Sequence, residues 1–280
     1  MKNEESLSEE RRGKSEEVAA AEGVNESSSK DTAAANSSLF TLHSSFNISL
    51  LSRVLDLICP RRCTACGCRL GVTEQTVCTP CLMHLPRTGY EACPDDNPVA
   101  RLFWGQVRIE RAASLFFFSP HSETARIIYR MKYYGGVDTC LDMGRTLARE
   151  YAPAGFFGGI DLIVPVPLTF RRRLSRGYNQ SEQLARGIAE VTGLPVDTHV
   201  VVRTRFSVSQ TRLSRSGRMD NVDGLFRLRS ADDARRIAGR HVLLVDDVVT
   251  SGATLMACAR ALMRAGGVRV SVLTLSFSHG

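Results

Sequence analysis

Two adjacent aspartates, Asp246 and Asp247, end an apolar run in the stretch HVLLVDDVVTSGATL at residues 241–255. The run has the composition of a central parallel strand, and open α/β sheets bind their ligands beyond the carboxyl ends of such strands. Carboxylates at that position accept hydrogen bonds from the vicinal hydroxyls of a sugar, and they also suit Mg²⁺, a hard cation that prefers oxygen ligands. The pair therefore predicts a sugar-binding site, with the hydroxyls contacted directly or through solvated magnesium.

The loop after this strand is small and rich in hydroxyl groups, and it consists of Thr250, Ser251, Gly252, Ala253 and Thr254. It opens a predicted helix, whose N-terminal amides and dipole favour an anion, and its small side chains let the backbone approach a phosphate. The plainer alternative is a Thr/Ser helix cap after an acidic strand end, which is common, but paired aspartates with this loop are a more specific pattern. The loop is not a Walker sequence, since it lacks the pattern G-x-x-x-x-G-K-[ST]. Together with the aspartate pair, we interpret it as a cradle for the 5′-phosphate of the sugar.

Four cysteines form a second candidate site, as the pairs Cys63-Thr-Ala-Cys66 and Cys78-Thr-Pro-Cys81. Each C-x-x-C pair makes a tight turn that directs two thiolates at one point, and two such turns close a tetrahedral shell around zinc. A closed shell leaves no open coordination position, so the expected role of Zn²⁺ is structural. The alternative is a set of buried free cysteines, but two such spacings are rarely accidental.

Charge is distributed unevenly along the 280 residues. Residues 1–45 carry five Lys or Arg and nine Asp or Glu with few apolar side chains, so we expect a disordered tail. Residues 46–280 carry 31 and 20, a basic excess that favours an anionic partner, either phosphate esters or nucleic acid. No apolar run reaches the ~20 residues of a membrane span, and the N-terminus has no secretory h-region. The expected location is therefore cytoplasmic, where cysteines are free thiols or metal ligands.

Strand and helix patterns alternate along the rest of the chain. Apolar spacing at 46–58 predicts a short docking helix ahead of the cysteine pairs. Strands are predicted at 112–118, 161–165, 200–203, 225–228, 242–245 and 268–277, and helices at 123–133, 141–151, 181–192 and 252–265. This alternation predicts an α/β fold with a mainly parallel sheet covered by helices on both faces. The predicted domains are the tail (1–45), the docking helix with the zinc ribbon (46–95) and the α/β domain (96–280).

Several stretches together resemble a known family. VLLVDDVVTSGAT resembles the phosphoribosyl pyrophosphate (PRPP) signature of type I phosphoribosyltransferases. The wider chain, from about residue 55 to 280, resembles the ComF family, which is named after a late competence protein for DNA uptake. The stretches that carry this resemblance are CTAC…CTPC, MKYYG (131–135), DLIVPVPL (161–168), RRRLSRGYNQSEQLA (171–185) and TRLSRSGRMDNVDGLF (211–226). Two positions depart from the family pattern: Cys93 stands where members often carry a second cysteine pair, and Ser251 replaces a threonine but keeps the hydroxyl.

The resemblance implies a type I phosphoribosyltransferase fold, preceded by the zinc ribbon, with PRPP and Mg²⁺ bound together. It assigns the ribose hydroxyls to the aspartate pair and the 5′-phosphate to residues 250–254. The pyrophosphate would face the loop after VPVPL, where Arg172, Arg173 and Arg176, with Lys132, offer cations to its oxygens. Each arginine taken singly is as often solvated surface as site. Residues 204–224 would form a mobile hood over the substrate.

Two functions are compatible with these patterns. The first is an enzyme that transfers a phosphoribosyl group from PRPP to a nitrogenous acceptor with release of pyrophosphate. The alternative is a non-catalytic adaptor in DNA uptake, which binds single-stranded DNA or DNA-processing proteins. Residues 169–218 hold ten arginines, and aromatic residues are interleaved with the basic ones in this part of the chain, a composition that also suits a single strand. Fold alone does not decide between these functions.

Overall fold

Four parallel strands form the central sheet, in the order β1-β6-β5-β2. The structure is a computed structural model, and it describes residues 59–133, 135–204 and 224–278. Within it, the described residues from Arg61 onward form one compact unit. The strands are β1 (Ala112–Phe117), β2 (Leu162–Pro165), β5 (His241–Val249) and β6 (Arg269–Phe277). The inner strands β5 and β6 are apolar on both faces, as a sheet covered on both sides requires.

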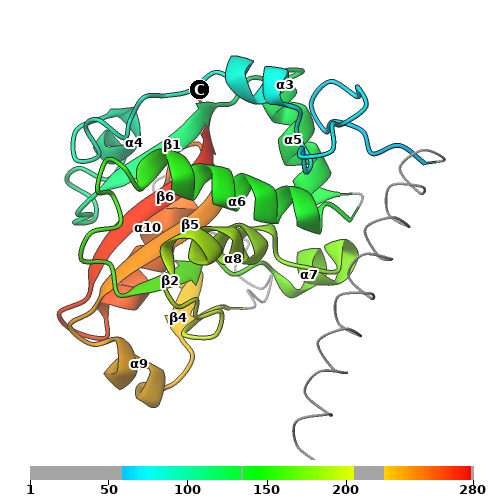
Figure 1. Ribbon diagram of the computed structural model, residues 1–280. Coiled ribbons are helices and arrows are strands. Elements are labelled where there is room, and N and C mark those ends of the chain that lie inside the picture. Colours follow the sequence, from blue (N-terminus) through cyan, green and yellow to red (C-terminus); the bar gives the residue numbers. More distant parts are fainter. Residues whose placement is uncertain (1–58, 134, 205–223, 279–280) are drawn as a thin grey trace, which may run out of the picture. The chain divides into compact units, whose positions relative to one another are not determined.

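Helices cover both faces of this sheet, which confirms the predicted fold class (Figure 1). The face toward Leu243 and Val245 of β5 packs against α5 (Glu123–Lys132), α6 (Val137–Tyr151) and α8 (Gln180–Thr192). The face toward Val242 and Leu244 packs against α10 (Ala253–Met263). Successive residues of β5 therefore belong to different cores, because side chains alternate across a strand.

Two glycines allow α6 and α8 to cross in close contact. A Cβ atom on Gly144 would lie 2.2 Å from the carbonyl oxygen of Leu184, and one on Gly187 would lie 2.2 Å from that of Leu141. Any larger residue at either position would push the helices apart. This crossing fixes α8, whose N-cap Asn179 also donates through Nδ2 to the carbonyl of Val166, 3.1 Å away, just beyond β2. The first turn of α8 is thus tied to the carboxyl edge of the sheet.

Several elements differ from the sequence-based expectation. The arginine-rich segment after β2 is a helix, α7 (Phe170–Arg176), where a loop was expected. The strands β3 (Val201–Arg203) and β4 (Phe226–Leu228) pair antiparallel in a separate two-stranded sheet and do not extend the central one. The helix α6 begins at residue 137 rather than 141, and β5 continues past the aspartates to residue 249. Helices α3 (Thr79–His84), α4 (Pro98–Arg101) and α9 (Ala231–Ile237) were not predicted.

The predicted tail, the docking helix at 46–58 and most of the predicted hood lie outside the described residues. The domain boundaries at 45 and 95 stay predictions. Among the described residues, no helix combines the length and the apolar content that a bilayer crossing requires.

Candidate functional site

Asp247 lies on the α5 and α8 side of the sheet, and it is 5 % exposed. Its Oδ2 atom accepts a hydrogen bond from Nε2 of Gln180 at 3.2 Å and lies 3.3 Å from Nζ of Lys132. Its Oδ1 atom accepts from the amide of Val248 at 2.8 Å. Both oxygens are therefore engaged by groups of the protein, as a buried polar group requires.

Asp246 has a different environment, because strand alternation directs it toward α10 and β3. It is partly exposed, and its Oδ1 accepts from Oγ of Ser181 at 2.8 Å and from the amide of Asp247 at 2.9 Å. Its Oδ2 makes no hydrogen bond within the described part of the chain. Burial, and then the charge of Asp247, raise the pKa of Asp246 from 3.8 to about 7. Each carboxylate has its own donor from the start of α8, but the two charges still repel, since Asp247 raises the pKa of Asp246.

The hydroxyl-rich loop lies immediately beyond this pair. A hollow of about 60 Å³ is lined by Asp246 and by residues 248–255. Gly252 is the N-cap of α10 and has a φ of +74°, a left-handed conformation that favours glycine. The side chains of Thr250, Ser251 and Ala253 are exposed around the hollow. Asp246 and the residues at the start of α10 therefore line one hollow.

The four predicted cations do not all occupy the same surroundings. Lys132 is the last residue of α5 and reaches Asp247 directly. Arg176 is partly buried on α7, its guanidinium lies 5.5 Å from the ring centre of Tyr133, and its Nη1 is buried without a hydrogen-bond partner. Arg172 and Arg173 are exposed on the same helix and make no ion pair with any described residue. The structure thus joins Lys132 to the aspartates and leaves α7 as a basic element beside them.

Three polar residues of this region were not among the predicted site residues. Gln180 and Ser181 hold the two aspartates, and the Oε1 atom of Gln180 is buried without a partner. Arg203 ends β3, and its guanidinium lies 5.3 Å from the ring centre of Phe226. Burial, and then the charge of Arg172, lower the pKa of Arg203, while Asp246 opposes that shift. For Gln180 and Ser181, the sequence signal is their place at the start of a helix, after Asn179, because helix N-termini often face an anionic ligand.

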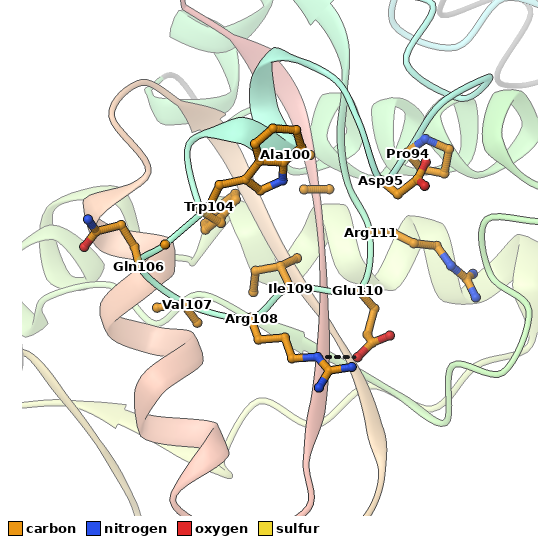
Figure 2. Close-up of a pocket in the computed structure, with 13 residues that line it drawn as sticks. Pro94, Asp95, Ala100, Trp104, Gln106, Val107, Arg108, Ile109, Glu110 and Arg111 are labelled. Carbon is orange, nitrogen blue, oxygen red and sulfur yellow. Dashed lines mark ion pairs between the residues drawn. The ribbon is translucent and has the colours of Figure 1, made fainter.

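A larger hollow, of about 460 Å³, lies in the loop between α4 and β1 (Figure 2). Its rim includes Trp104, and Arg108 and Glu110 lie 3.9 Å apart there. None of the residues predicted for the site lines it. The chain just after α4 nevertheless packs against the loop at residues 250–254, because Leu102 lies within 3.5 Å of the position that a Cβ on Gly252 would take.

The four predicted cysteine ligands are brought together. One Sγ atom from each of Cys63, Cys66, Cys78 and Cys81 lies within 4.8 Å of the others, and three of these residues are buried. A tetrahedral zinc ion with Zn–S bonds of about 2.3 Å requires sulfur atoms about 3.8 Å apart. The Sγ atoms of Cys66 and Cys78 are 3.7 Å apart. The arrangement therefore fits a metal ion held by four thiolates.

Local hydrogen bonds shape the ribbon around these cysteines. The carboxylate of Glu74 accepts from the amides of Gly71 at 2.7 Å and Thr79 at 2.6 Å, and hydrogen bonding from Thr79 and then Gly71 lowers its pKa. The backbone of Cys68 lowers the pKa of Cys66 to about 6, whereas burial raises the pKa of Cys78 and of Cys81. Gly67 has a φ of +79° in the first turn. Both knuckles are thus preformed by the backbone.

Comparison with known proteins gives consistent matches. The family model described as "Phosphoribosyl transferase domain" matches residues 137–278. The chain is 28% identical over 229 residues to "DNA utilization protein YhgH" of Salmonella typhimurium, covering 78% of this chain and 98% of that protein. It is 30% identical over 216 residues to the protein of that name in Escherichia coli (strain K12), covering 76% and 88%. It is 23% identical over 239 residues to "Competence protein ComFC" of Bacillus subtilis, covering 83% and 91%.

Proposed function

The chain belongs to the ComF family of proteins with a phosphoribosyltransferase domain, and from that premise we propose that it binds PRPP with Mg²⁺ at the carboxyl end of β5. The observation that carries the proposal is the free Oδ2 atom of Asp246 beside the hollow of the 250–254 loop. An anion cradle next to an unsatisfied carboxylate oxygen matches a molecule that carries a phosphate and hydroxyl groups. The cysteine cluster would hold structural Zn²⁺.

In this proposal the two aspartates have unequal roles. Asp246 accepts hydrogen bonds from the ribose hydroxyls, and Asp247, whose oxygens are already engaged by Lys132 and Gln180, keeps the site negative and ordered. The loop at residues 250–254 holds the 5′-phosphate. The carboxylate oxygens also suit magnesium, which would neutralise charge on the leaving pyrophosphate when it is bound with PRPP.

Transfer would proceed at C1 of the ribose. The C1–O bond breaks and its electron pair leaves with pyrophosphate, so positive charge develops on the ring. A nitrogen of the acceptor donates its electron pair to C1 and then loses a proton to solvent. Arg172, Arg173 and Arg176, with Lys132, would stabilise the charge of the departing pyrophosphate, a contribution of positioning and electrostatics.

Calorimetric titration of PRPP in excess Mg²⁺ tests this proposal. We expect binding to the wild type, and at least ~10-fold weaker binding to Asp246→Asn, because charge-assisted hydrogen bonds contribute about 1.5–3 kcal/mol. Asp232→Asn, a change at an exposed carboxylate of α9, is the matched control and should bind as the wild type does. Release of pyrophosphate in the presence of a nucleobase panel then decides whether the protein turns over. Absence of binding heat in the wild type would contradict the proposal.

A second candidate function, binding of single-stranded DNA, is favoured by an aromatic pair beside α7. The rings of Tyr129 and Tyr133 are stacked with centroids 6.5 Å apart, and the residues are 57% and 49% exposed. The guanidinium of Arg176 lies over the Tyr133 ring. Exposed aromatic rings next to arginine suit stacked bases and a phosphate backbone.

Gel-shift titration with an unstructured oligonucleotide tests the second candidate. The Tyr129→Ala change should weaken binding, and the affinity should fall steeply with salt. If instead removal of the cysteine ribbon abolished binding and Tyr129→Ala did not, the contact would lie on the ribbon. If the partner is instead a DNA-processing protein, this chain need not bind the oligonucleotide itself, and no gel shift is then expected.

A further inference from the structure

Helix α5 touches the cysteine ribbon at its first turns and the aspartate pair at its last residue. It has ten residues, from Glu123 to Lys132, so it is about 15 Å long at 1.5 Å per residue. Its buried residues Ile127, Ile128 and Met131 belong to the same core as the ribbon cysteines and Leu243 of β5. A helix packed in this way moves as one piece, so a change at one end is felt at the other.

At the ribbon end, two side chains of α5 contact the two knuckles separately. Nη1 of Arg126 donates to the carbonyl of Ala65 at 2.8 Å, between the first two cysteines of the cluster. Oε1 of Glu123 lies 3.7 Å from Sγ of Cys81, in the second pair. The neighbouring helix α6 holds the ribbon as well, because Oδ2 of Asp142 accepts from Oγ1 of Thr76 at 2.6 Å.

At the other end, α5 is fixed to the site by two contacts. Lys132 lies against Asp247, and the carbonyl of Met131 accepts from the hydroxyl of Tyr178 at 2.7 Å, just ahead of α8. A Cβ on Gly136 would lie 2.2 Å from the carbonyl of Arg130, so the turn after α5 is also tightly packed. The position of Lys132 therefore depends on where α5 lies.

We propose that α5 couples the cysteine cluster to the site at the end of β5, with Arg126 as the positioning residue. This inference rests on the proposed binding of PRPP. A metal ion held by all four thiolates fixes the two knuckles relative to each other, so that Ala65 anchors α5 through Arg126 while Asp142 of α6 holds Thr76 beside the second knuckle. Loss of the metal frees the first knuckle from the second, and Lys132 is then held less firmly beside Asp247.

Coupling of this kind is reciprocal, because the two binding events share one free-energy cycle. The metal strengthens PRPP binding, and PRPP strengthens metal binding by the same factor. We expect a factor of at least about 5, the lower end of the range typical for coupled sites. Arg126→Met keeps the length of the side chain but removes the donor. It should reduce the coupling factor to no more than about 2.

Zinc-competition titration with a chelating dye, with and without saturating PRPP and excess magnesium, measures this factor on the intact, metal-loaded chain. Calorimetry of PRPP on metal-loaded and metal-free protein measures it from the other side, with circular dichroism to confirm that the sheet persists. Arg126→Lys should restore coupling, because an ammonium group still donates to the Ala65 carbonyl. Arg235→Met, at an exposed ion pair on α9, is the control and should leave the factor unchanged.

Each outcome has a defined meaning. Equal zinc affinity with and without PRPP, in a protein that binds PRPP, overturns the coupling and leaves the proposed function standing. Undiminished coupling in Arg126→Met overturns the assignment to α5. Absence of PRPP binding to the metal-loaded wild type overturns both the proposed function and this inference.

Discussion

The site at the end of β5 and the cysteine ribbon are both predicted from short sequence patterns, but they are held together by different means. The aspartates stand on a central strand with hydrogen-bonded neighbours on both sides, and α8 supplies Gln180 and Ser181 from a helix locked by a glycine crossing. Within residues 61–85, which the structure describes throughout, the only strand pairing is one isolated bridge, Arg62 to Arg69. Its geometry depends on thiols that converge on a common point.

The difference indicates which changes each region should be sensitive to. A sheet-borne site keeps its shape without a ligand, because backbone and core determine it. A segment too small for its own core depends on the ion that its ligands share. Substitutions in the two regions should therefore have different consequences. A change at the helix crossing should lower the stability of the whole domain, and a change at a cysteine should unfold the ribbon alone.

The largest effect is expected from Cys78→Ser, which removes one buried ligand of the cluster. Metal binding in small zinc domains is worth roughly 10–16 kcal/mol, so the loss of one ligand should leave residues 61–85 unfolded. The central sheet should persist. Limited proteolysis with mass spectrometry checks this, and Cys93→Ser, at an exposed cysteine outside the cluster, is the control. Cleavage spread evenly over the chain would contradict the separation of the two regions.

The next effect is global and comes from Gly187→Ala. The new Cβ would lie 2.2 Å from the carbonyl oxygen of Leu141, so α6 and α8 must separate. We expect a loss of about 1–3 kcal/mol in the free energy of unfolding, typical of overpacking. Urea denaturation measures it, with Gly158→Ala as control, where the new Cβ would be 3.2 Å from its nearest carbonyl. If Gly187→Ala lost its metal but kept the free energy of unfolding of the wild type, this prediction would be wrong.

Gln180→Leu should affect the site more than the fold. The amide donates to Asp247, but its Oε1 is already buried without a partner, so an apolar side chain of similar size removes one contact and one unsatisfied atom together. We expect a change of no more than about 1 kcal/mol in stability and a loss of about 3–10-fold in PRPP affinity, since Asp247 would then be held by Lys132 and the Val248 amide alone. Thermal denaturation and calorimetry on the same preparation separate the two quantities. If stability and PRPP affinity fell by the same free energy, Gln180 would contribute to the core and not to the site.

Sequence reasoning predicted the fold and the strand-end pair because those patterns are local. The apolar run before Asp246, the small loop after it and the C-x-x-C spacings each lie within fifteen residues. The helix α7 was not predicted, since none of its residues is buried and only two of them, Phe170 and Leu174, are apolar. Its signals were only Thr169, which caps the first turn, and Gly177, whose φ of +78° ends the last.

The partners of the aspartates were beyond sequence reasoning for a different reason. Gln180 and Asp247 are 67 residues apart, and their contact depends on the crossing of α6 and α8 and on the Asn179 contact to Val166. A pattern of residue types does not determine such a distance. The same holds for the contact of Lys132 with Asp247, which no local sequence pattern indicates. The sequence thus predicted candidate groups for the site, and packing determined which of them meet.

A dependence of PRPP affinity on pH is also expected, and it comes from Asp246. Because the pKa of Asp246 is raised to about 7 in the folded protein, its carboxyl group is protonated at pH 6 and largely ionised at pH 8. Ionisation costs stability as the pH rises from about 4 to 7, since the unfolded chain has the lower pKa. A ligand whose hydroxyls donate to Asp246 requires the ionised form, so PRPP affinity should rise by up to about 10-fold between pH 6 and 8, with release of a proton.

Calorimetry of PRPP binding in two buffers of different ionisation enthalpy measures that proton directly. The phosphates of PRPP also titrate near pH 6, but Asp246→Asn retains their contribution and removes that of the carboxyl group. The groups around Asp246 are Asp247, which raises its pKa, and Ser181, the Asp247 amide and Lys132, which lower it. Lys132→Met should therefore raise the pKa further and shift the affinity curve to higher pH. If wild type and Asp246→Asn release the same number of protons, the free oxygen of Asp246 does not contact the ligand, and the contrast between the two carboxylates is a property of the fold alone.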